Sequence, residues 1–382
     1  MEAPQRFINF NTNQAENAKI IGKPRILLAP LDWGLGHTTR CIPLIKELLR
    51  EGAEVFLAGN EIQAELFLKE FPGLPVMYLQ GYNIRYSSSK SGFLWSIIRQ
   101  ILKIKKAIKS ENKWLKALLT EYAVDAVISD NRYGLYTDAV PCIFMTHQLA
   151  IQSPFGKWVQ PLLQKWNYKY INRFNECWVP DNEGNENLGG DLSHPGNKPV
   201  IPLKYIGALS RFERKGLKEK KNHLLIVLSG PEPQRSILED KLIDEVVHYN
   251  GTADIVRGLP ATDKLMPSTN QIHFYNHLPA SELNNKLEEA SFVISRCGYS
   301  TVMDLVKLKK KSILIPTPGQ TEQEYLAKYL FNKKIAVCIN QQDFSLKKSL
   351  QEAESFDYHF TDLDDSLLKP VISDFLMKLK EG

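Results

Sequence analysis

The chain contains 382 residues, of which 43% are hydrophobic and 24% are charged, and its formal net charge is +5. This length exceeds what one compact core usually holds, so the sequence predicts two domains of a soluble globular protein. The modest positive charge argues against nucleic acid as a partner but is compatible with an anionic ligand or an anionic membrane surface. The cysteines are scattered without a CxxC pair, which argues against structural zinc and disulfides and is typical of a reducing cytosol.

The first α/β unit is predicted over residues 23–208. Residues 1–22 are polar and rich in Asn, and we expect a loose leader rather than a signal peptide. Strands are predicted at residues 25–30, 54–60, 125–130, 142–148, 176–181 and 204–210. A helix with one apolar face is predicted from about Thr38 to Arg50, with Pro43 near its start. No apolar run in the sequence reaches the length that spans a bilayer.

A charged stretch at residues 209–222 is predicted to link this unit to a second one at residues 223–360, and a C-terminal helix is predicted within residues 361–382. Strands of the second unit are predicted at residues 223–230, 253–258, 272–278, 291–296, 312–318 and 335–340. Alternating strands and helices favour parallel sheets, whose ligands gather at the carboxyl ends of the strands. We therefore predict an α/β fold of two Rossmann-like domains that face each other across a cleft.

The segment LDWGLGHTTR at residues 31–40 joins the first predicted strand to the first helix. It is an imperfect dinucleotide-binding loop, because Thr39 stands where a third glycine is needed, although Glu61 has a spacing suited to a ribose contact. Gly34 and Gly36 allow a tight turn that presents His37 at the helix N-terminus. The helix dipole would lower the imidazole pKa there, which suits a general base. Simple capping of the helix by His37 is the alternative.

A second strand-to-helix turn lies near residue 300. A strand is predicted to end at Ser295, and the chain turns at Gly298 into a helix that begins near Ser300 and Thr301. Such helix starts bind phosphate through free amides and the helix dipole, and Asp304 could accept hydrogen bonds from ribose hydroxyls. The alternative is an ordinary N-cap by Ser300 or Thr301.

The next predicted strand also ends in a polar turn, PTPGQTEQE, before a helix. Gln320, Gln323 and Glu324 in this turn carry groups that can hydrogen-bond the hydroxyls of a sugar. Two neighbouring polar turns of this kind favour a nucleotide-sugar site over capping alone.

These turns resemble the donor-binding half of the GT-B glycosyltransferases of family 28, and most closely the MurG type, which transfers N-acetylglucosamine from UDP in lipid II synthesis. The family pattern R-x-G-x-x-T-v-x-E corresponds here to Arg296, Gly298, Thr301 and Asp304. The resemblance implies an inverting, metal-independent transferase that uses a nucleotide sugar, with UDP as nucleotide, and no other cofactor. It further implies an acceptor hydroxyl in cell-envelope glycan or glycolipid synthesis and a cytoplasmic enzyme, peripheral on the inner face of the membrane.

The resemblance also implies roles for single residues of the second unit. The acidic residue that holds the ribose would be Asp304, although it is Asp rather than Glu, and the Gln pair that reads the sugar would be Gln323 and Glu324. Arg211 would approach the diphosphate. Further expected donor contacts are Ser229, Gly230 and Leu278, the last of these beside the base.

The first unit has counterparts too. The family's proposed acceptor-side base corresponds to His37, preceded by Gly36. The pattern GxGHxxRcxxL is similar to the UDP-sugar hydrolase of pseudaminic acid synthesis and would map onto Gly34, Gly36, His37, Arg40 and Cys41. Transfer to a hydroxyl and hydrolysis by water therefore stay open, as does a non-catalytic nucleotide-sugar or lipid-binding protein.

Polar residues at two other strand ends of the first unit are further acceptor-side candidates: Asp130, Asn131, Arg132, His147 and Gln148. His147 is the rival to His37 as a base, and each of these side chains could instead bond to loop backbone. No DxD-type metal site is recognised at a strand end, so we expect no metal ligands.

Residues 92–119 are both apolar and basic. One helical stripe is predicted to hold Trp95, Ile98, Ile101, Leu102 and Ile108, with Lys103, Lys105, Lys106 and Lys109 around it. This segment could lie on an anionic membrane or could pack on the sheet with solvated lysines. The aromatic-rich residues 156–174 could extend that surface or wall the acceptor site.

Overall fold

The computed structural model describes residues 23–82, 93–153, 159–260, 262 and 264–381, and it describes side chains within the helix that begins at residue 93 only from residue 102 onward. The first sheet is parallel, with strand order β3-β2-β1-β4-β5-β6-β7. Its strands are β1 (Arg25–Pro30), β2 (Glu54–Gly59), β3 (Val76–Tyr78), β4 (Ala126–Asp130), β5 (Cys142–Met145), β6 (Glu176–Val179) and β7 (Leu203–Tyr205).

The second sheet is also parallel, with strand order β10-β9-β8-β11-β12-β13. Its strands are β8 (His223–Val227), β9 (Thr252–Val256), β10 (Ile272–Tyr275), β11 (Phe292–Arg296), β12 (Ser312–Ile315) and β13 (Val337–Cys338). In each sheet the strand order reverses next to the first strand, between β1 and β4 and between β8 and β11. Loops that leave such reversal points diverge and create a place for ligands.

Helices cover both sheets. Those of the first part of the chain are α1 (Leu35–Arg50), α2 (Glu61–Glu70), α3 (Phe93–Glu121), α4 (Gln160–Ile171) and the short 3₁₀ helix η1 (Gly190–Leu192). Those of the second part are α5 (Gln234–Val246), α6 (Ala280–Glu289), α7 (Tyr299–Lys307), α8 (Thr321–Asn332), α9 (Leu346–Ser355) and α10 (Leu368–Glu381). Because helices lie on both faces, the central strands are mainly apolar, and every residue of β1 is buried.

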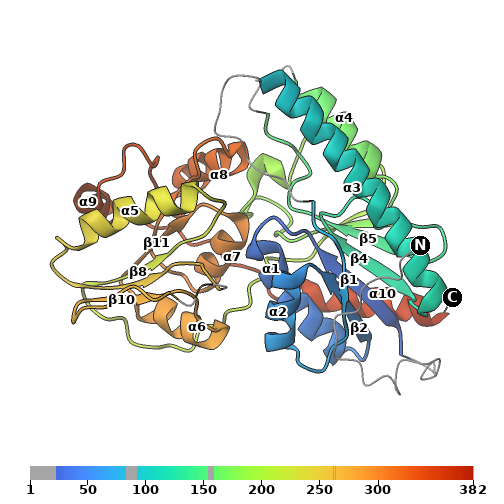
Figure 1. Cartoon of the computed structure of the whole chain (residues 1–382), viewed down its shortest axis with the longest axis horizontal. Coiled ribbons are helices and arrows are strands. Elements are labelled where there is room, and N and C mark those ends of the chain that lie inside the picture. Colours follow the sequence, from blue (N-terminus) through green and yellow to red (C-terminus); the bar gives the residue numbers. More distant parts are fainter. Residues whose placement is uncertain (1–22, 83–92, 154–158, 261, 263, 382) are drawn as a thin grey trace.

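The two α/β domains lie side by side, and α10 crosses back to the first domain (Figure 1). Ser373 Oγ donates to Glu51 Oε2 at 2.8 Å, and the ring of Phe375 packs on Trp178 with centroids 5.2 Å apart. The C-terminal helix therefore joins the core of the N-terminal domain. None of the helices in the described ranges is long and apolar enough to cross a membrane.

The structure differs from the sequence predictions in three places. The three-residue strand β3 was not predicted, because so short a strand carries little periodicity. The helix predicted from Thr38 begins at Leu35, so Pro43 lies inside α1, where it removes one helical hydrogen bond, rather than near its start. The stretch predicted as a linker begins with two buried side chains, Leu209 and Phe212, which belong to the main hydrophobic core, and it is exposed only from Glu213 onward.

Candidate active site between the two domains

The loop between β1 and α1 places His37 against the end of β4. Gly34 has φ +78°, a backbone conformation that favours glycine, and it begins the turn into α1. His37 Nδ1 lies 3.1 Å from Asp130 Oδ2, and the His37 side chain is 14% exposed. A carboxylate only accepts hydrogen bonds, so Nδ1 carries the proton and Nε2 keeps its lone pair.

Burial and charge together set the protonation of this pair. Burial lowers the pKa of His37 most, the Arg40 guanidinium lowers it further, and Asp130 acts in the opposite direction. Burial alone would raise the pKa of Asp130, but Arg40 and His37 outweigh it and hold that pKa well below its usual range. The site thus contains a neutral imidazole oriented by an ionised carboxylate, which is the arrangement of a general base.

His147 belongs to the same hydrogen-bond network but has the other tautomer, with its proton on Nε2. Arg40 donates through Nε to Asp130 Oδ2 at 2.9 Å, and its Nη2 donates to Asp130 Oδ1. Arg40 Nη1 lies 3.0 Å from His147 Nδ1 and can only donate, so Nδ1 accepts and Nε2 carries the proton. That proton is donated to Glu322 Oε1 at 2.7 Å. Both ring nitrogens of His147 are occupied, which favours His37 as the base.

Two helix starts meet where the domains touch. Ser300 Oγ at the beginning of α7 donates to Gly36 O at 2.9 Å, one residue before His37. A Cβ atom on Gly36 would lie only 3.1 Å from Ser300 Oγ, so glycine permits this close approach. Tyr299 OH donates to Pro180 O at 3.0 Å, and its ring stacks on His147 at 4.1 Å. The loop that carries His37 therefore contacts the start of α7.

The starts of α7 and α8 were predicted either to bind an anion or to be capped by side chains. Gly298 and Gln320 occupy their N-cap positions, and neither helix start has a side-chain cap among the described residues. The hydroxyl of Ser300 bonds to the other domain instead of capping α7, and Thr301 is half-buried. Because β11 and β12 are neighbours, two sets of first-turn amides lie at the same edge of the sheet.

Arg211 and Asp304, which are far apart in sequence, are brought together. Ser210 Oγ donates to Asp304 Oδ1 at 2.6 Å. Burial raises the pKa of Asp304 to about 6, against the opposing effects of Arg211 and Ser210. Burial also lowers the pKa of Arg211, and its buried Nε has no hydrogen-bond partner within the described part of the chain. Both predicted donor residues lie on the C-terminal side of the domain contact.

Arg296 has a position that the motif did not predict. Its side chain is 1% exposed and donates to two backbone carbonyls, Gln234 O at 2.6 Å and Pro316 O at 3.4 Å. Arg296 therefore joins the first residue of α5 to the turn after β12 and does not face outward toward a donor. In the loop between β8 and α5, Ser229 is exposed, and Gly230 has φ +104°.

The other predicted donor residues bond mainly within their own turn. Gln323 Oε1 accepts from Thr317 N at 2.9 Å, and its Nε2 donates to Gln320 Oε1 at 2.5 Å. Glu324 Oε1 accepts from Gly319 N at 2.9 Å. These contacts stabilise the turn. The side chain of Leu278 is buried in the core, so only its main chain can face a ligand.

Two residues after β4 stabilise the loop. Asn131 has φ 59°, and Arg132 pairs with buried Glu111 at 2.8 Å and donates to Pro30 O at 2.7 Å.

A cavity of about 610 Å³ lies on the face of α8 away from Glu322, so it is separate from the His37 site. It is lined by Pro316, Glu324, Ala327, Lys328, Phe331, Asn332, Cys338, Ile339 and Asn340.

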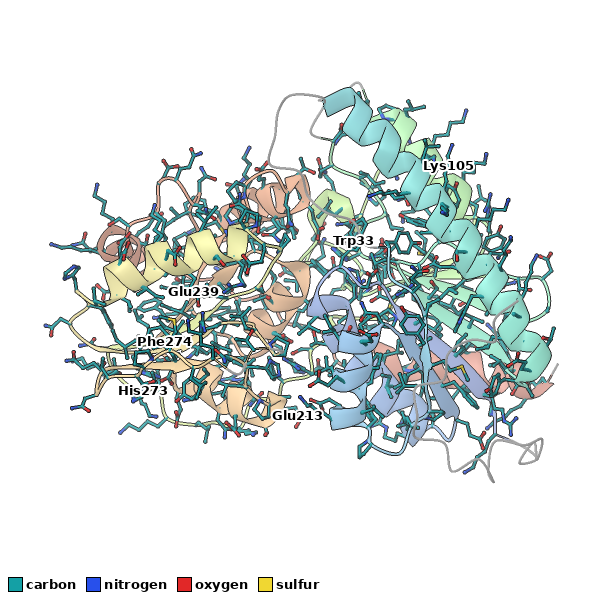
Figure 2. The ribbon with its side chains drawn as sticks, viewed as in Figure 1. Trp33, Lys105, Glu213, Glu239, His273 and Phe274 are labelled. Atoms are coloured by element: carbon teal, nitrogen blue, oxygen red, sulfur yellow. The ribbon has the colours of Figure 1, made fainter. Side chains whose placement is uncertain are left out.

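The apolar stripe predicted on α3 is divided between two faces. Ile108 is 5% exposed and packs in a small core with Leu31 and Tyr82, whereas Leu102 is 60% exposed. The predicted basic residues lie on the exposed side, and Lys105 marks that face in Figure 2. The side chains of Trp95, Ile98 and Ile101, and residues 156–158 of the aromatic stretch, lie outside what the structure describes.

Solved structures share the fold of the whole chain. The glycotransferase of kitacinnamycin matches with a TM-score of 0.59 and 14% identity, covering 94% of this chain and 95% of that one. CalG4, the calicheamicin glycosyltransferase, matches with a TM-score of 0.59 and 13% identity, covering 94% and 93%. The chain therefore has the GT-B fold of these glycosyltransferases.

Sequence comparison finds a family match in the second domain. Residues 246–359 match the model of the glycosyltransferase family 28 C-terminal domain. Two relatives are both named UDP-N-acetylglucosamine–N-acetylmuramyl-(pentapeptide) pyrophosphoryl-undecaprenol N-acetylglucosamine transferase. The one from Listeria monocytogenes serotype 4b is 24% identical over 81% of this chain and 84% of its own length. The one from Nostoc sp. is 25% identical over 84% and 85%.

The sequence missed two residues of the site. Glu322 precedes the pair compared with the sugar-reading glutamines, and Tyr299 precedes the predicted helix start. Both sit in turns that were recognised, but their partners His147 and Pro180 lie in the other domain. Only knowledge of how the domains dock could have identified them.

Proposed function

We propose that the protein transfers a sugar from a UDP-sugar to a hydroxyl group of an acceptor. The observation that carries this proposal is the contact between Ser300 Oγ and Gly36 O, because it brings the loop of His37, whose imidazole keeps a free lone pair, to an uncapped helix start. A base for the acceptor and a site for the donor diphosphate then lie next to each other. The family 28 domain and the names of the relatives support UDP as the nucleotide.

In the proposed reaction, His37 Nε2 takes the proton of the acceptor hydroxyl while the acceptor oxygen bonds to the anomeric carbon. The bond from that carbon to the diphosphate oxygen breaks, and UDP leaves with the electron pair. First-turn amides of α7 and α8, together with Arg211, stabilise the leaving diphosphate. A single displacement of this kind inverts the anomeric configuration. The scheme uses no metal, so we expect EDTA to leave turnover unchanged.

The acceptor is proposed to be lipid-linked and the enzyme to act peripherally at the cytoplasmic face of a membrane. Support comes from the pyrophosphoryl-undecaprenol acceptor in the names of the relatives and from the exposed basic face of α3. Co-sedimentation with anionic vesicles at low salt tests this, with Lys103→Glu and Lys105→Glu expected to weaken binding. Absence of binding by the unaltered protein would contradict the membrane assignment.

The donor is tested first by calorimetry over UDP-, TDP- and GDP-sugars. We expect binding with a preference for uridine, and a preference for another nucleotide would contradict the donor assignment. Turnover is then measured with acceptor hydroxyls, and a protein that binds UDP-sugars but converts none would be a binding module.

Hydrolysis of a UDP-sugar is the second candidate. The residues shared with the hydrolase pattern gather at one carboxylate, since Arg40 donates to Asp130 and Cys41 Sγ lies 3.7 Å from it. In that reaction His37 takes a proton from water instead of from a hydroxyl. Rapid release of free sugar and UDP without an acceptor would favour hydrolysis over transfer.

A further inference from the structure

One carboxylate of the C-terminal domain reaches into the polar network of the N-terminal domain. Glu322 lies in the first turn of α8, and its side chain is 31% exposed. Its Oε1 accepts a hydrogen bond from His147 Nε2 at 2.7 Å, and its Oε2 accepts one from the side-chain amide of Gln148. Both partners follow β5 in the other domain, so these bonds exist only while the two domains are together.

The contacts continue from His147 to the base without interruption. His147 Nδ1 accepts from Arg40 Nη1 at 3.0 Å, and Arg40 Nε donates to Asp130 Oδ2 at 2.9 Å. The same oxygen faces His37 Nδ1 at 3.1 Å. Arg40 and Asp130 are 2% and 0% exposed, so water does not screen this path.

We infer that Glu322 is a positioning residue that couples closure of the two domains to the orientation and base strength of His37. This inference rests on the proposed role of His37 as the base. By accepting the hydrogen bond from Nε2–H, Glu322 fixes the tautomer of His147 whose Nδ1 can accept from Arg40. A proton on Nδ1 would instead face the guanidinium at 3.0 Å and push Arg40 away from Asp130.

The charged groups around the two imidazoles determine whether loss of the Glu322 charge raises or lowers the pKa of His37. His37 faces Asp130 from β4, Arg40 from α1 and the ring of His147, and the thiol of Cys41 also points at Asp130. His147 faces Arg40, Glu322 and the stacked ring of Tyr299.

Burial would raise the pKa of Glu322, but His147 and then His37 and Arg40 lower it, so Glu322 is ionised near neutral pH. Without its charge, the cation of Arg40 is balanced by Asp130 alone, and the pKa of His37 falls further.

The test compares Glu322→Ala and Glu322→Gln with the unaltered enzyme across pH, using UDP-N-acetylglucosamine as the donor probe. In both variants we expect the acidic limb of the kcat profile to move to lower pH by about half a unit, since a nearby negative charge is removed. We expect kcat to fall about tenfold in the Ala variant, with partial rescue in the Gln variant, whose amide oxygen can still accept from His147.

Tyr329→Phe is the matched control. Tyr329 lies on the same helix and bonds to Asn187 of the other domain at 2.8 Å, but it is outside the network of His37. We expect this variant to keep the pH profile of the unaltered enzyme. An equal shift in Tyr329→Phe would overturn the inference, because general loosening of the domains would then explain the effect.

A second readout does not depend on turnover. Nitrogen NMR of the histidine side chains, assigned with His37→Gln and His147→Gln, reports tautomer and titration in the protein alone. We expect His147 to carry its proton on Nε2, and His37 to titrate at lower pH in Glu322→Gln. If no nucleotide sugar is turned over but these shifts occur, the proposed function fails and the coupling stands. Turnover with unchanged histidine titration in Glu322→Gln would overturn the coupling alone.

Discussion

The helix starts of α1 and α7 face each other at the domain contact, yet their polar groups are partnered in opposite ways. On the α1 side, Asp130 accepts from both His37 and Arg40, and the carboxylate is fully buried. On the α7 side, the buried Nε atom of Arg211 has no partner within the described chain. The hydrogen bonds on the α1 side hold His37 in one orientation before any ligand binds. The α7 side retains a buried donor whose desolvation an anion would offset.

This difference separates chemistry from binding within one site. Changes on the α1 side should alter kcat, because they disturb the orientation or the charge of one imidazole. Changes on the α7 side should alter donor affinity, because they remove groups that face the nucleotide or its phosphates.

The sharpest test of this separation is His37→Ala. We expect kcat to fall by about 10²–10⁴-fold, the usual loss when a general base is removed, while calorimetric binding of UDP stays the same. His359→Ala, at an exposed loop position, serves as the control and should change neither quantity. Unimpaired turnover in His37→Ala would refute the assignment of the base.

The buried pair on the α1 side should also dominate stability. Arg40→Met removes the main partner of Asp130 and leaves a buried carboxylate, which destabilises the fold by about 3–5 kcal/mol. Arg50→Met is the matched control on the same helix, because Arg50 is largely exposed in its pair with Glu47 and should cost less than about 1 kcal/mol. Urea unfolding of both variants measures the difference. Similar losses in the two would mean that the buried pair contributes no more than a surface pair.

The sequence predicted the strands other than β3, because these are mainly apolar runs followed by polar, glycine or proline residues. The prediction for residues 25–30 coincides with β1, and most others extend one to five residues past the observed strand. The boundary of α1 was less accurate, because Leu35 and Gly36 give no clear helix signal. Local pattern thus located the loops that carry the site.

The pairings inside the site could not be predicted in the same way. His37 and Asp130 were both named as candidates, but they are 93 residues apart, and their contact depends on β1 and β4 being neighbours. Arg296 matched a motif position, but the motif does not show which way its side chain points, and the side chain bonds to two backbone carbonyls instead of facing a donor. Glu322 was missed because its partners follow β5 in the other domain.

A smaller effect is expected on the donor side at Asp304. Its pKa is about 6 in the free protein, and the ionised carboxylate is the form that accepts hydrogen bonds from ribose hydroxyls. Binding of UDP-N-acetylglucosamine should therefore be tight above this pKa and should weaken about tenfold as the pH falls from about 7 to about 5. Asp304→Asn should bind weakly at both pH values. A pH dependence that persists in Asp304→Asn would assign the titration to another group.

The smallest expected effect concerns the contact that joins the two regions. Ser300→Ala removes one neutral hydrogen bond, from Ser300 Oγ to Gly36 O, which is worth about 1 kcal/mol or roughly fivefold in kcat/KM. Thr321→Val removes a similar bond between the domains, from Thr321 Oγ1 to Gln152 O at 2.9 Å. Unlike Gly36, Gln152 is not adjacent to His37 in the sequence.

If the contact at Gly36 aligns base and donor, Ser300→Ala should lower kcat, whereas Thr321→Val should leave kcat nearly unchanged. Equal losses in the two variants would show that the Ser300 bond only holds the domains together. In that case the side chains on each helix start would account for the difference between catalysis and donor binding. The contact between the starts of α1 and α7 would not contribute to it.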